Sequence, residues 1–425
     1  MFHLTGLSGK CAFVCGVALA MALPSTGADA KNKGGGFDSL YSFCSQDNCA
    51  DGASPVAGLV MDSSGNLYGT ASGGGANYDG VVFKLAPDGT ETTLYTFCSQ
   101  ANCPDGQIPA ASLILDNSGN LYGTTSAGGS QSQGTVFKLA PDGSETVLYS
   151  FCSRKHCTDG ATPVAGLVMD SSGNLYGTTQ SGGKGTYQPG VVFRLAPNGT
   201  EKVLHGFCSQ ANCADGASPV AGLVMDNSGN LFGTTQYGGT QNYGAVFKLG
   251  PNGGETVIYS FCSQANCVDG DTPDAGLIMD GSGNLYGTTV AGGAGHCENE
   301  TGSGCGAVFK LTQDGAETVL YSFCSRISCT DGANPAASLV MDSAGNLYGT
   351  TSARGKCRFA TDCGTVFKIA PNGSESTLYS FCSRRFCADG ANPVANLIMD
   401  GSGNLYGTAE NGGAYYSGTV FELKE

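Results

Sequence analysis

The chain repeats one pattern of apolar and polar positions seven times along its 425 residues. In each copy, four short runs of β-branched and aromatic residues are separated by turn residues. The first full copy has these runs at residues 58–61, 66–71, 81–86 and 92–97. Short runs of this kind predict β-strands, and nothing in the chain repeats at helical spacing. Each copy is therefore expected to fold as a four-stranded meander.

Two kinds of connection alternate within a copy. The first two runs are joined by D-x-S-G-N and the last two by P-[DN]-G, in which Asp or Asn caps its own turn and Gly adopts a positive φ. These connections predict tight hairpins. A Gly-rich stretch of variable length joins the second and third runs, and a C-x-x-x-x-C-x-D-G loop leads to the next copy. The first Asp of the hairpin recurs every 54 to 62 residues, at Asp62, Asp116, Asp170, Asp226, Asp280, Asp342 and Asp400.

A single four-stranded sheet cannot bury both of its apolar faces, whereas copies stacked face to face around an axis can. The chain opens with a lone fourth run at 40–43 and ends with a lone third run at 420–423, so the two ends together complete one copy. Pairing them would remove the open edges of the sheet. We therefore predict an all-β, seven-bladed β-propeller of four-stranded antiparallel blades, closed by pairing the N-terminal strand with the C-terminal blade.

The repeated phrase itself is distinctive. G-L-V-M-D-x-S-G-N-L-Y-G-T-T followed by G-x-V-F-K-L, quoted from residues 58–85 and recurring to Leu423, resembles the Gloeo/Verruco (GloVer) tandem repeat of secreted bacterial proteins. The resemblance covers nearly the whole mature chain. It implies an exported, propeller-like repeat protein and assigns no catalytic residue. Some members carry a C-terminal anchoring tail, and we expect none here because Glu425 directly follows the last strand.

The N-terminus has the pattern of a cleavable secretory signal. Residues 1–30 contain one basic residue, Lys10, an apolar core at 11–23 and the small-residue end Ala28-Asp29-Ala30. The apolar run is too short for a membrane span. We expect cleavage near Ala30, a short leader at 31–36 and a single propeller over 37–425. The protein is thus expected outside the cell, at the cell surface or in the periplasm.

The cysteines point to the same compartment. Cys11 and Cys15 lie in the signal, which leaves 18 of the 20 cysteines in the mature chain. A metal site would need thiolate clusters or nearby His, and export favours oxidation, so we predict disulfides. Nine local pairs are expected: Cys44/Cys49, Cys98/Cys103, Cys152/Cys157, Cys208/Cys213, Cys262/Cys267, Cys297/Cys305, Cys324/Cys329, Cys357/Cys363 and Cys382/Cys387.

A net charge of −15 argues against nucleic acid as a partner. Binding residues are sought instead among departures from the repeat, on the face that carries the variable and cysteine-containing loops. Basic residues gather around the sixth copy and suit a ligand with carboxylate, sulfate or phosphate groups. The alternative is that they only balance acidic neighbours. The candidates are Arg326, Arg354, Lys356, Arg358, Arg384 and Arg385.

Acidic residues gather around the fifth copy, at Asp269, Asp271, Asp274, Glu298 and Glu300. Their hard oxygen atoms suit Ca²⁺, and a solvated acidic loop is the alternative. The Asp of each D-G pair either contributes to a ring of carboxylates around the channel mouth or caps a turn. These residues are Asp51, Asp105, Asp159, Asp215, Asp269, Asp331 and Asp389.

The sequence favours a secreted, disulfide-stapled binding or scaffold module, with an anionic glycan as its ligand. A hydrolase or lyase with a site at the channel mouth and a purely structural envelope or matrix component are the alternatives. No G-x-S-x-G elbow or Ser/His/Asp order is visible, so the sequence favours a non-enzymatic role and leaves the enzyme alternative open. No cofactor is required, with Ca²⁺ left open. We expect a monomer whose ligand is a carbohydrate or surface polymer.

Overall fold

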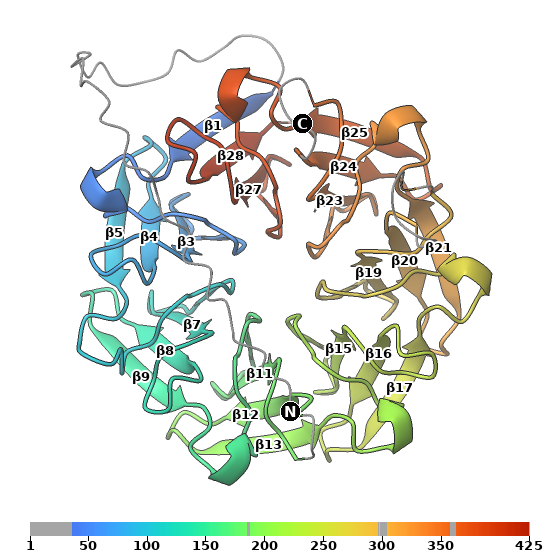
Figure 1. Ribbon diagram of the computed structural model, residues 1–425, viewed down its shortest axis with the longest axis horizontal. Coiled ribbons are helices and arrows are strands. Elements are labelled where there is room, and N and C mark those ends of the chain that lie inside the picture. The colour runs from blue at the N-terminus through green and yellow to red at the C-terminus, as the bar shows by residue number, and fades with distance from the viewer. Residues whose placement is uncertain (1–35, 185–187, 296, 298–303, 358–362, 425) are drawn as a thin grey trace, which may run out of the picture. The chain divides into compact units, whose positions relative to one another are not determined.

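The computed structural model describes residues 36–184, 188–295, 297, 304–357 and 363–424. The predicted signal peptide, 1–30, and leader residues 31–35 lie outside this part of the chain. The described residues form seven four-stranded antiparallel sheets arranged as the blades of a ring, which confirms the predicted propeller (Figure 1). Blades one to six each take four consecutive strands from β2 to β25, and blade seven combines β26, β27 and β28 with β1.

The strand nearest the ring axis has two residues in every blade, because the preceding residues of the first apolar run turn toward the axis. These strands are β2 (Val60–Met61), β6 (Ile114–Leu115), β10 (Val168–Met169), β14 (Val224–Met225), β18 (Ile278–Met279), β22 (Val340–Met341) and β26 (Ile398–Met399). The second strands are β3 (Leu67–Ala71), β7 (Leu121–Thr125), β11 (Leu175–Thr179), β15 (Leu231–Thr235), β19 (Leu285–Thr289), β23 (Leu347–Thr351) and β27 (Leu405–Ala409).

The third strands are buried on both faces and supply most of each blade's core. They are β4 (Val81–Leu85), β8 (Thr135–Leu139), β12 (Val191–Leu195), β16 (Ala245–Leu249), β20 (Ala307–Leu311), β24 (Thr365–Ile369) and β28 (Thr419–Leu423). The outermost strands are β5 (Glu91–Thr96), β9 (Glu145–Ser150), β13 (Glu201–Gly206), β17 (Glu255–Ser260), β21 (Glu317–Ser322), β25 (Glu375–Ser380) and β1 (Phe37–Ser42).

Short 3-10 helices form within the cysteine-containing loops that follow the outermost strands. They are η1 (Asp47–Cys49), η2 (Lys155–Cys157), η3 (Ala211–Cys213), η4 (Ala265–Cys267), η5 (Ile327–Cys329) and η6 (Arg385–Cys387). The tight hairpins form as the sequence predicts. Asp62 accepts hydrogen bonds from the backbone N–H groups of Ser64 and Asn66, both at 2.9 Å, and the same contacts recur at the six equivalent Asp residues.

Neighbouring blades meet through a pair of buried Phe rings. Phe97, which follows the outermost strand of blade one, packs edge-on against Phe137 in the third strand of blade two, with ring centroids 5.0 Å apart. The six other interfaces carry the same pair at 4.9 to 5.1 Å. A Cβ on Gly123 would lie 2.7 Å from the Phe137 ring. The Gly of the repeated L-Y-G-T segment therefore makes room for the ring.

Two polar contacts flank the Phe pair. Nearer the axis, the Thr70 hydroxyl donates to the carbonyl of Ala111 in the next blade, and all seven interfaces repeat this bond. At the outer edge, a side chain from the cysteine-containing loop contacts the first Glu of the next outermost strand. Arg154 pairs with Glu201 at 2.6 Å and Arg326 with Glu375 at 2.5 Å. Each interface is thus held nearer the axis and in its middle, and the interfaces with Arg154 and Arg326 are also held at the rim.

The ring closes between blades seven and one with the same contacts. β1 pairs antiparallel with β28, from Phe37 opposite Leu423 to Ser42 opposite Thr419. Phe43 then packs on Phe83 of blade one, and Thr408 donates to the carbonyl of Ala57 across 351 positions of the sequence. The pairing of the two chain ends, predicted from the lone strands, is confirmed.

The first strand and the leader should contribute very differently to stability. Deleting residues 37–43 removes β1 and the fully buried Phe43, which should cost more than the about 3 to 5 kcal/mol of one Phe truncation. Removing residues 31–36 should leave Tm nearly unchanged. Thermal unfolding of the two truncated proteins checks this, and equal Tm values would contradict closure by β1.

All nine predicted disulfides are present. Seven close the C-x-x-x-x-C loops, while Cys297–Cys305 and Cys357–Cys363 lie in the long second-to-third connections of blades five and six. An oxidising compartment is where such bonds persist.

Alkylation of the mature protein under denaturing, non-reducing conditions should therefore label no cysteine. Peptide mapping should recover Cys297 joined to Cys305 and Cys357 joined to Cys363. A labelled thiol at any of these positions would show that the pair is reduced in the native protein.

The inter-blade Glu residues should make stability depend on pH. Burial raises the pKa of Glu145 from 4.5 to about 7, and the nearby Asp105 raises it further. The folded state thus binds this proton more tightly than the unfolded chain, so the stabilisation is fully present below 4.5 and is lost as pH rises through about 7. The same direction holds for Glu91, Glu201, Glu255, Glu317 and Glu375.

Glu145→Gln should consequently raise Tm at about pH 8, on the order of 1–2 °C for a domain of this size, and change little at about pH 4.5. Glu375→Gln is the contrasting variant, because it leaves Arg326 without its partner and should lower Tm at about pH 8. Calorimetry at the two pH values decides the matter. A gain from Glu145→Gln that is equal at both values would exclude ionisation as its cause.

Candidate functional site

The cysteine-containing loops and the variable loops pack together on one face of the ring. In blade one, Ala53 and Gly73 form a β-bridge between these two loops. The N–H of Gly75 in the variable loop also donates to the carbonyl of Cys49, at 2.8 Å. We call this surface the loop face. It carries the departures from the repeat that the sequence singled out.

The Asp of each D-G pair is a structural residue and not part of a channel-mouth ring. Asp51 is fully buried and its Oδ2 accepts hydrogen bonds from the Tyr41 hydroxyl at 2.7 Å and the Ser45 N–H at 2.8 Å. The Ser45 hydroxyl and the Gln46 N–H complete its shell. Because Tyr41 belongs to the outermost strand, these carboxylates lie away from the axis. The hypothesis of a carboxylate ring around the channel is therefore wrong.

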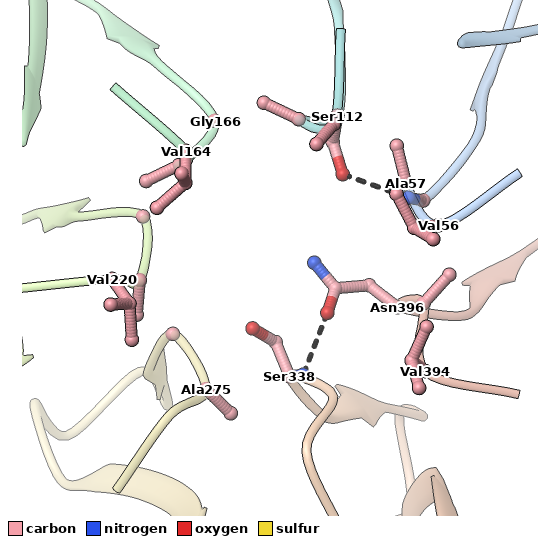
Figure 2. A pocket seen from close by; sticks show the side chains of 18 of the residues that line it. Val56, Ala57, Ser112, Val164, Gly166, Val220, Ala275, Ser338, Val394 and Asn396 are labelled. Carbon is pink, nitrogen blue, oxygen red and sulfur yellow. Dashed lines mark hydrogen bonds between the residues drawn. The ribbon is translucent and has the colours of Figure 1, made fainter. Parts of the chain in front are cut away.

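The channel itself is narrow. Small and apolar side chains from all seven blades surround an axial cavity of about 100 Å³ (Figure 2). Departures from the repeat add polar side chains to this lining. The Ser112 hydroxyl accepts a hydrogen bond from the N–H of Gly58, and Asn396 Oδ1 accepts one from the N–H of Ser338. Ligand pockets usually measure about 300 to 1,000 Å³. The axial cavity is too small for a sugar ring.

The acidic residues around blade five do not gather at one point. Asp269 is buried and accepts hydrogen bonds from Tyr259 and Ser263, as its equivalents do in the blades that carry this Tyr. Asp271 accepts a bond from the Thr272 hydroxyl at 2.6 Å. Asp274 lines the axial cavity, where burial raises its pKa to about 6 against a hydrogen bond from Gln236. Glu298 and Glu300 lie outside the described residues.

A metal site does not emerge from these carboxylates. Within the described ranges, the groups of three ligand atoms close enough to share an ion are Cys297, Cys305 and Cys324, and Asp79, Cys98 and Cys103. Every one of these cysteines belongs to a disulfide, which removes the thiolate that a metal would bind. Ca²⁺ binding thus stays a hypothesis from the sequence.

The structure separates the predicted basic residues into two groups. Arg326 pairs with the buried Glu375 at 2.5 Å and donates to its backbone carbonyl at 3.1 Å, so it belongs to the interface between blades five and six. Arg384 lies 5.9 Å from the Phe37 ring, the residue that replaces the usual Glu at the next interface. Lys356 and Arg385 are exposed, and Arg354 is partly buried at φ 63°. Arg358 lies outside the described residues.

Phe386 is an exposed aromatic residue that the sequence did not indicate as a candidate. Phe386 lies in the middle of η6 with φ 60°, is 60% exposed and has the Arg385 guanidinium 4.7 Å from its ring centroid. The signal was present, because the equivalent residue is Asn48, Asn102, Asn212 or Asn266 in four other loops. Asn tolerates positive φ, whereas a bulky side chain there is a rare outlier. Phe386 is therefore retained against a conformational cost.

The described part of the chain contains no helix that is long and apolar enough to cross a membrane.

One solved structure shares the fold at low identity, and two others align with lower scores. The extracellular domain of a putative hybrid two-component system from B. thetaiotaomicron aligns with a TM-score of 0.57 and 11% identity, over 91% of this chain and 39% of that longer chain. A putative gluconolactonase aligns with a TM-score of 0.42 and 16% identity, over 76% of this chain and 91% of the other. A luciferin-regenerating enzyme gives 0.40 and 13%, over 89% and 94%. At these identities the likeness concerns the fold alone.

No curated protein matches the sequence significantly. The Gloeobacter/Verrucomicrobia repeat, in contrast, matches three overlapping segments, at residues 29–214, 99–300 and 295–425. Together these segments contain every blade of the ring. The chain therefore belongs to the Gloeobacter/Verrucomicrobia repeat family.

Proposed function

We propose that this protein is an exported binding module that holds an anionic glycan on the loops around blade six. Export is supported by the nine disulfides, which persist in oxidising compartments, and by the signal-like N-terminus. The observation that carries the binding role is the pair Arg385 and Phe386 at the tip of η6. An exposed aromatic ring beside a guanidinium is a surface suited to a sugar that carries a carboxylate or sulfate.

The backbone at Phe386 supports a function over a structural role. A non-Gly residue at positive φ costs of order 1–3 kcal/mol and persists where the surrounding structure imposes it, often at binding sites. Here the disulfide Cys382–Cys387 encloses the turn. The equivalent residue has a positive φ in all seven disulfide-closed loops, so the loop imposes this conformation on Phe386. The Phe side chain is poorly placed to offset this cost by burial, because 60% of its surface remains exposed.

Further cations surround this pair on the same face. Lys356 is exposed on the variable loop of blade six, and its N–H donates to the Ser380 hydroxyl at the end of β25, at 3.3 Å. Arg384 precedes Arg385, and Arg354 lies in the same variable loop as Lys356. Arg358, in that loop, is assigned to the site from the sequence alone. Positive charge gathered on a protein of net charge −15 favours an anionic partner.

Arg326 is left out of this proposed site because Glu375 already neutralises it. The alternative of a hydrolase or lyase with a site at the channel mouth has less support. The D-G carboxylates are buried near the outermost strands, and the axial cavity measures about 100 Å³. A purely structural role is the remaining competitor, and it predicts no ligand at η6.

The double variant Arg385→Ser, Phe386→Asn should lose retention on an acidic polysaccharide column at low salt. We expect a loss of about tenfold or more in affinity, because one exposed charge contact of about 0.2–1 kcal/mol and one stacking contact disappear together. Wild-type retention should fall steeply above physiological ionic strength, where charges are screened within about 8 Å. Tm should stay the same or rise, since Asn suits the positive φ.

The matched control is Lys155→Ser, His156→Asn, which changes the same two positions of η2 and removes the same charge. It should be retained like the wild type. Co-elution of the wild type with the η6 variant at low salt would favour the structural role instead.

A further inference from the structure

Blade three breaks the repeat at the end of its outermost strand. β13 ends in His205 and Gly206, where the other six outermost strands end in Tyr followed by Ser or Thr. The fold itself requires neither change, because the six regular blades form with the usual residues. The contacts that the Tyr and the Ser make in the regular blades are therefore the contacts that blade three lacks.

The regular Ser closes the gap between the outermost strand and the variable loop. Its hydroxyl accepts a hydrogen bond from a loop N–H in five blades, at 3.0 to 3.4 Å. Gly206 offers no hydroxyl, and a Cβ placed on it would meet no heavy atom within 4 Å. Among the described residues, nothing fills the gap in blade three.

The regular Tyr is also replaced by a shorter side chain. In the other blades the Tyr hydroxyl donates to the buried Asp of the D-G pair at 2.6 to 2.9 Å. His205 Nε2 lies 3.3 Å from Asp215 Oδ2, farther than the Tyr hydroxyl lies from the equivalent Asp in the other blades. Burial lowers the pKa of His205 against the attraction of Asp215. The shorter, neutral imidazole leaves space where the other blades have a phenol ring.

These two changes open a cavity of about 460 Å³ beside β13, within the usual range for small-molecule pockets. Its polar wall consists of one carboxylate, three cations and two hydroxyl groups. The cavity is more than four times the size of the axial one. The polar groups are Glu201, Arg154, Lys184, Lys202, Thr158 and Ser209.

The buried end of the cavity is formed by an ion pair. The Glu201 side chain is fully buried and faces Arg154 at 2.6 Å, whereas the Arg154 side chain is 46% exposed. The same pair occurs between Arg326 and Glu375, so the ion pair belongs to the fold. The cavity next to it is lined by residues of blade three and of the loops that precede and follow this blade.

We infer that this cavity binds a small hydroxylated carboxylic acid, of the size of one sugar acid. Arg154 is paired with Glu201, and the two remaining cations, Lys184 and Lys202, leave the wall positive, which favours a negatively charged ligand. Glu201, His205, Thr158 and Ser209 offer hydrogen bonds that suit hydroxyl groups. The pocket lies in blade three and is independent of the proposed glycan site at η6.

The test returns blade three to the regular repeat. Calorimetric titration of the mature wild-type protein with sodium glucuronate should show binding, and glucose, which lacks the carboxylate, should bind at least about tenfold more weakly. His205→Tyr, Gly206→Ser fills the cavity with the residues of the other blades and should weaken glucuronate binding at least about tenfold, equivalent to about 1.4 kcal/mol. Its Tm should equal or exceed that of the wild type, which shows that the fold is intact.

Two further variants separate the causes. Lys202→Thr introduces the residue that four other outermost strands carry at this position and should weaken glucuronate binding while glucose is unaffected. The η6 variant Arg385→Ser, Phe386→Asn should bind glucuronate like the wild type, so failure of one proposal does not affect the other. Absence of glucuronate binding to the wild type, equal binding to the refilled variant, or equal binding of glucose would each overturn the inference.

Discussion

The edge-on contact between two Phe rings at each blade interface is the interaction on which the ring depends. Each ring is fully buried, and the same geometry recurs at all seven interfaces with centroids 4.9 to 5.1 Å apart. A blade alone would expose these rings to water, and burial of such large apolar surfaces is the main source of stability. The repeated Gly of L-Y-G-T follows from this contact, because any side chain there would collide with the ring.

Buried polar groups next to the Phe rings make hydrogen bonds that compensate for the loss of water. The Asp of each D-G pair accepts bonds from a hydroxyl and from backbone N–H groups, which makes its burial tolerable. The inter-blade Glu is less well compensated, and burial raises its pKa to about 7 in five blades. Arg154 and Arg326 supply a partner at two interfaces. Part of the basic character of the loops therefore serves the interfaces and not a ligand.

Because the seven blades are equivalent, each residue can be compared with the residues at the same position of the other six blades. Most positions are explained by contacts that recur around the ring, so a residue that departs from the repeat without a new buried contact points to another role. Phe386 departs in this way, and Gly206 leaves a space where other blades have a hydroxyl. Arg326 also departs from the commoner Gln, yet its contact with Glu375 gives it a structural explanation. The distinction separates candidate binding residues from those that hold the blades together.

The sequence by itself determined the strands, the hairpins, the closing pair of chain ends and the nine disulfides. These features are local or repeated, so seven copies of one pattern reinforce each reading, and Cys44 reaches Cys49 within a single loop. Only the tertiary structure decided which charges remain free, because the partner of Arg326 is 49 positions away in the next blade. It also placed Asp274 at the axis and turned the D-G carboxylates toward the outermost strands. Contacts between blades depend on how the sheets stack around the axis, and no local pattern records that geometry.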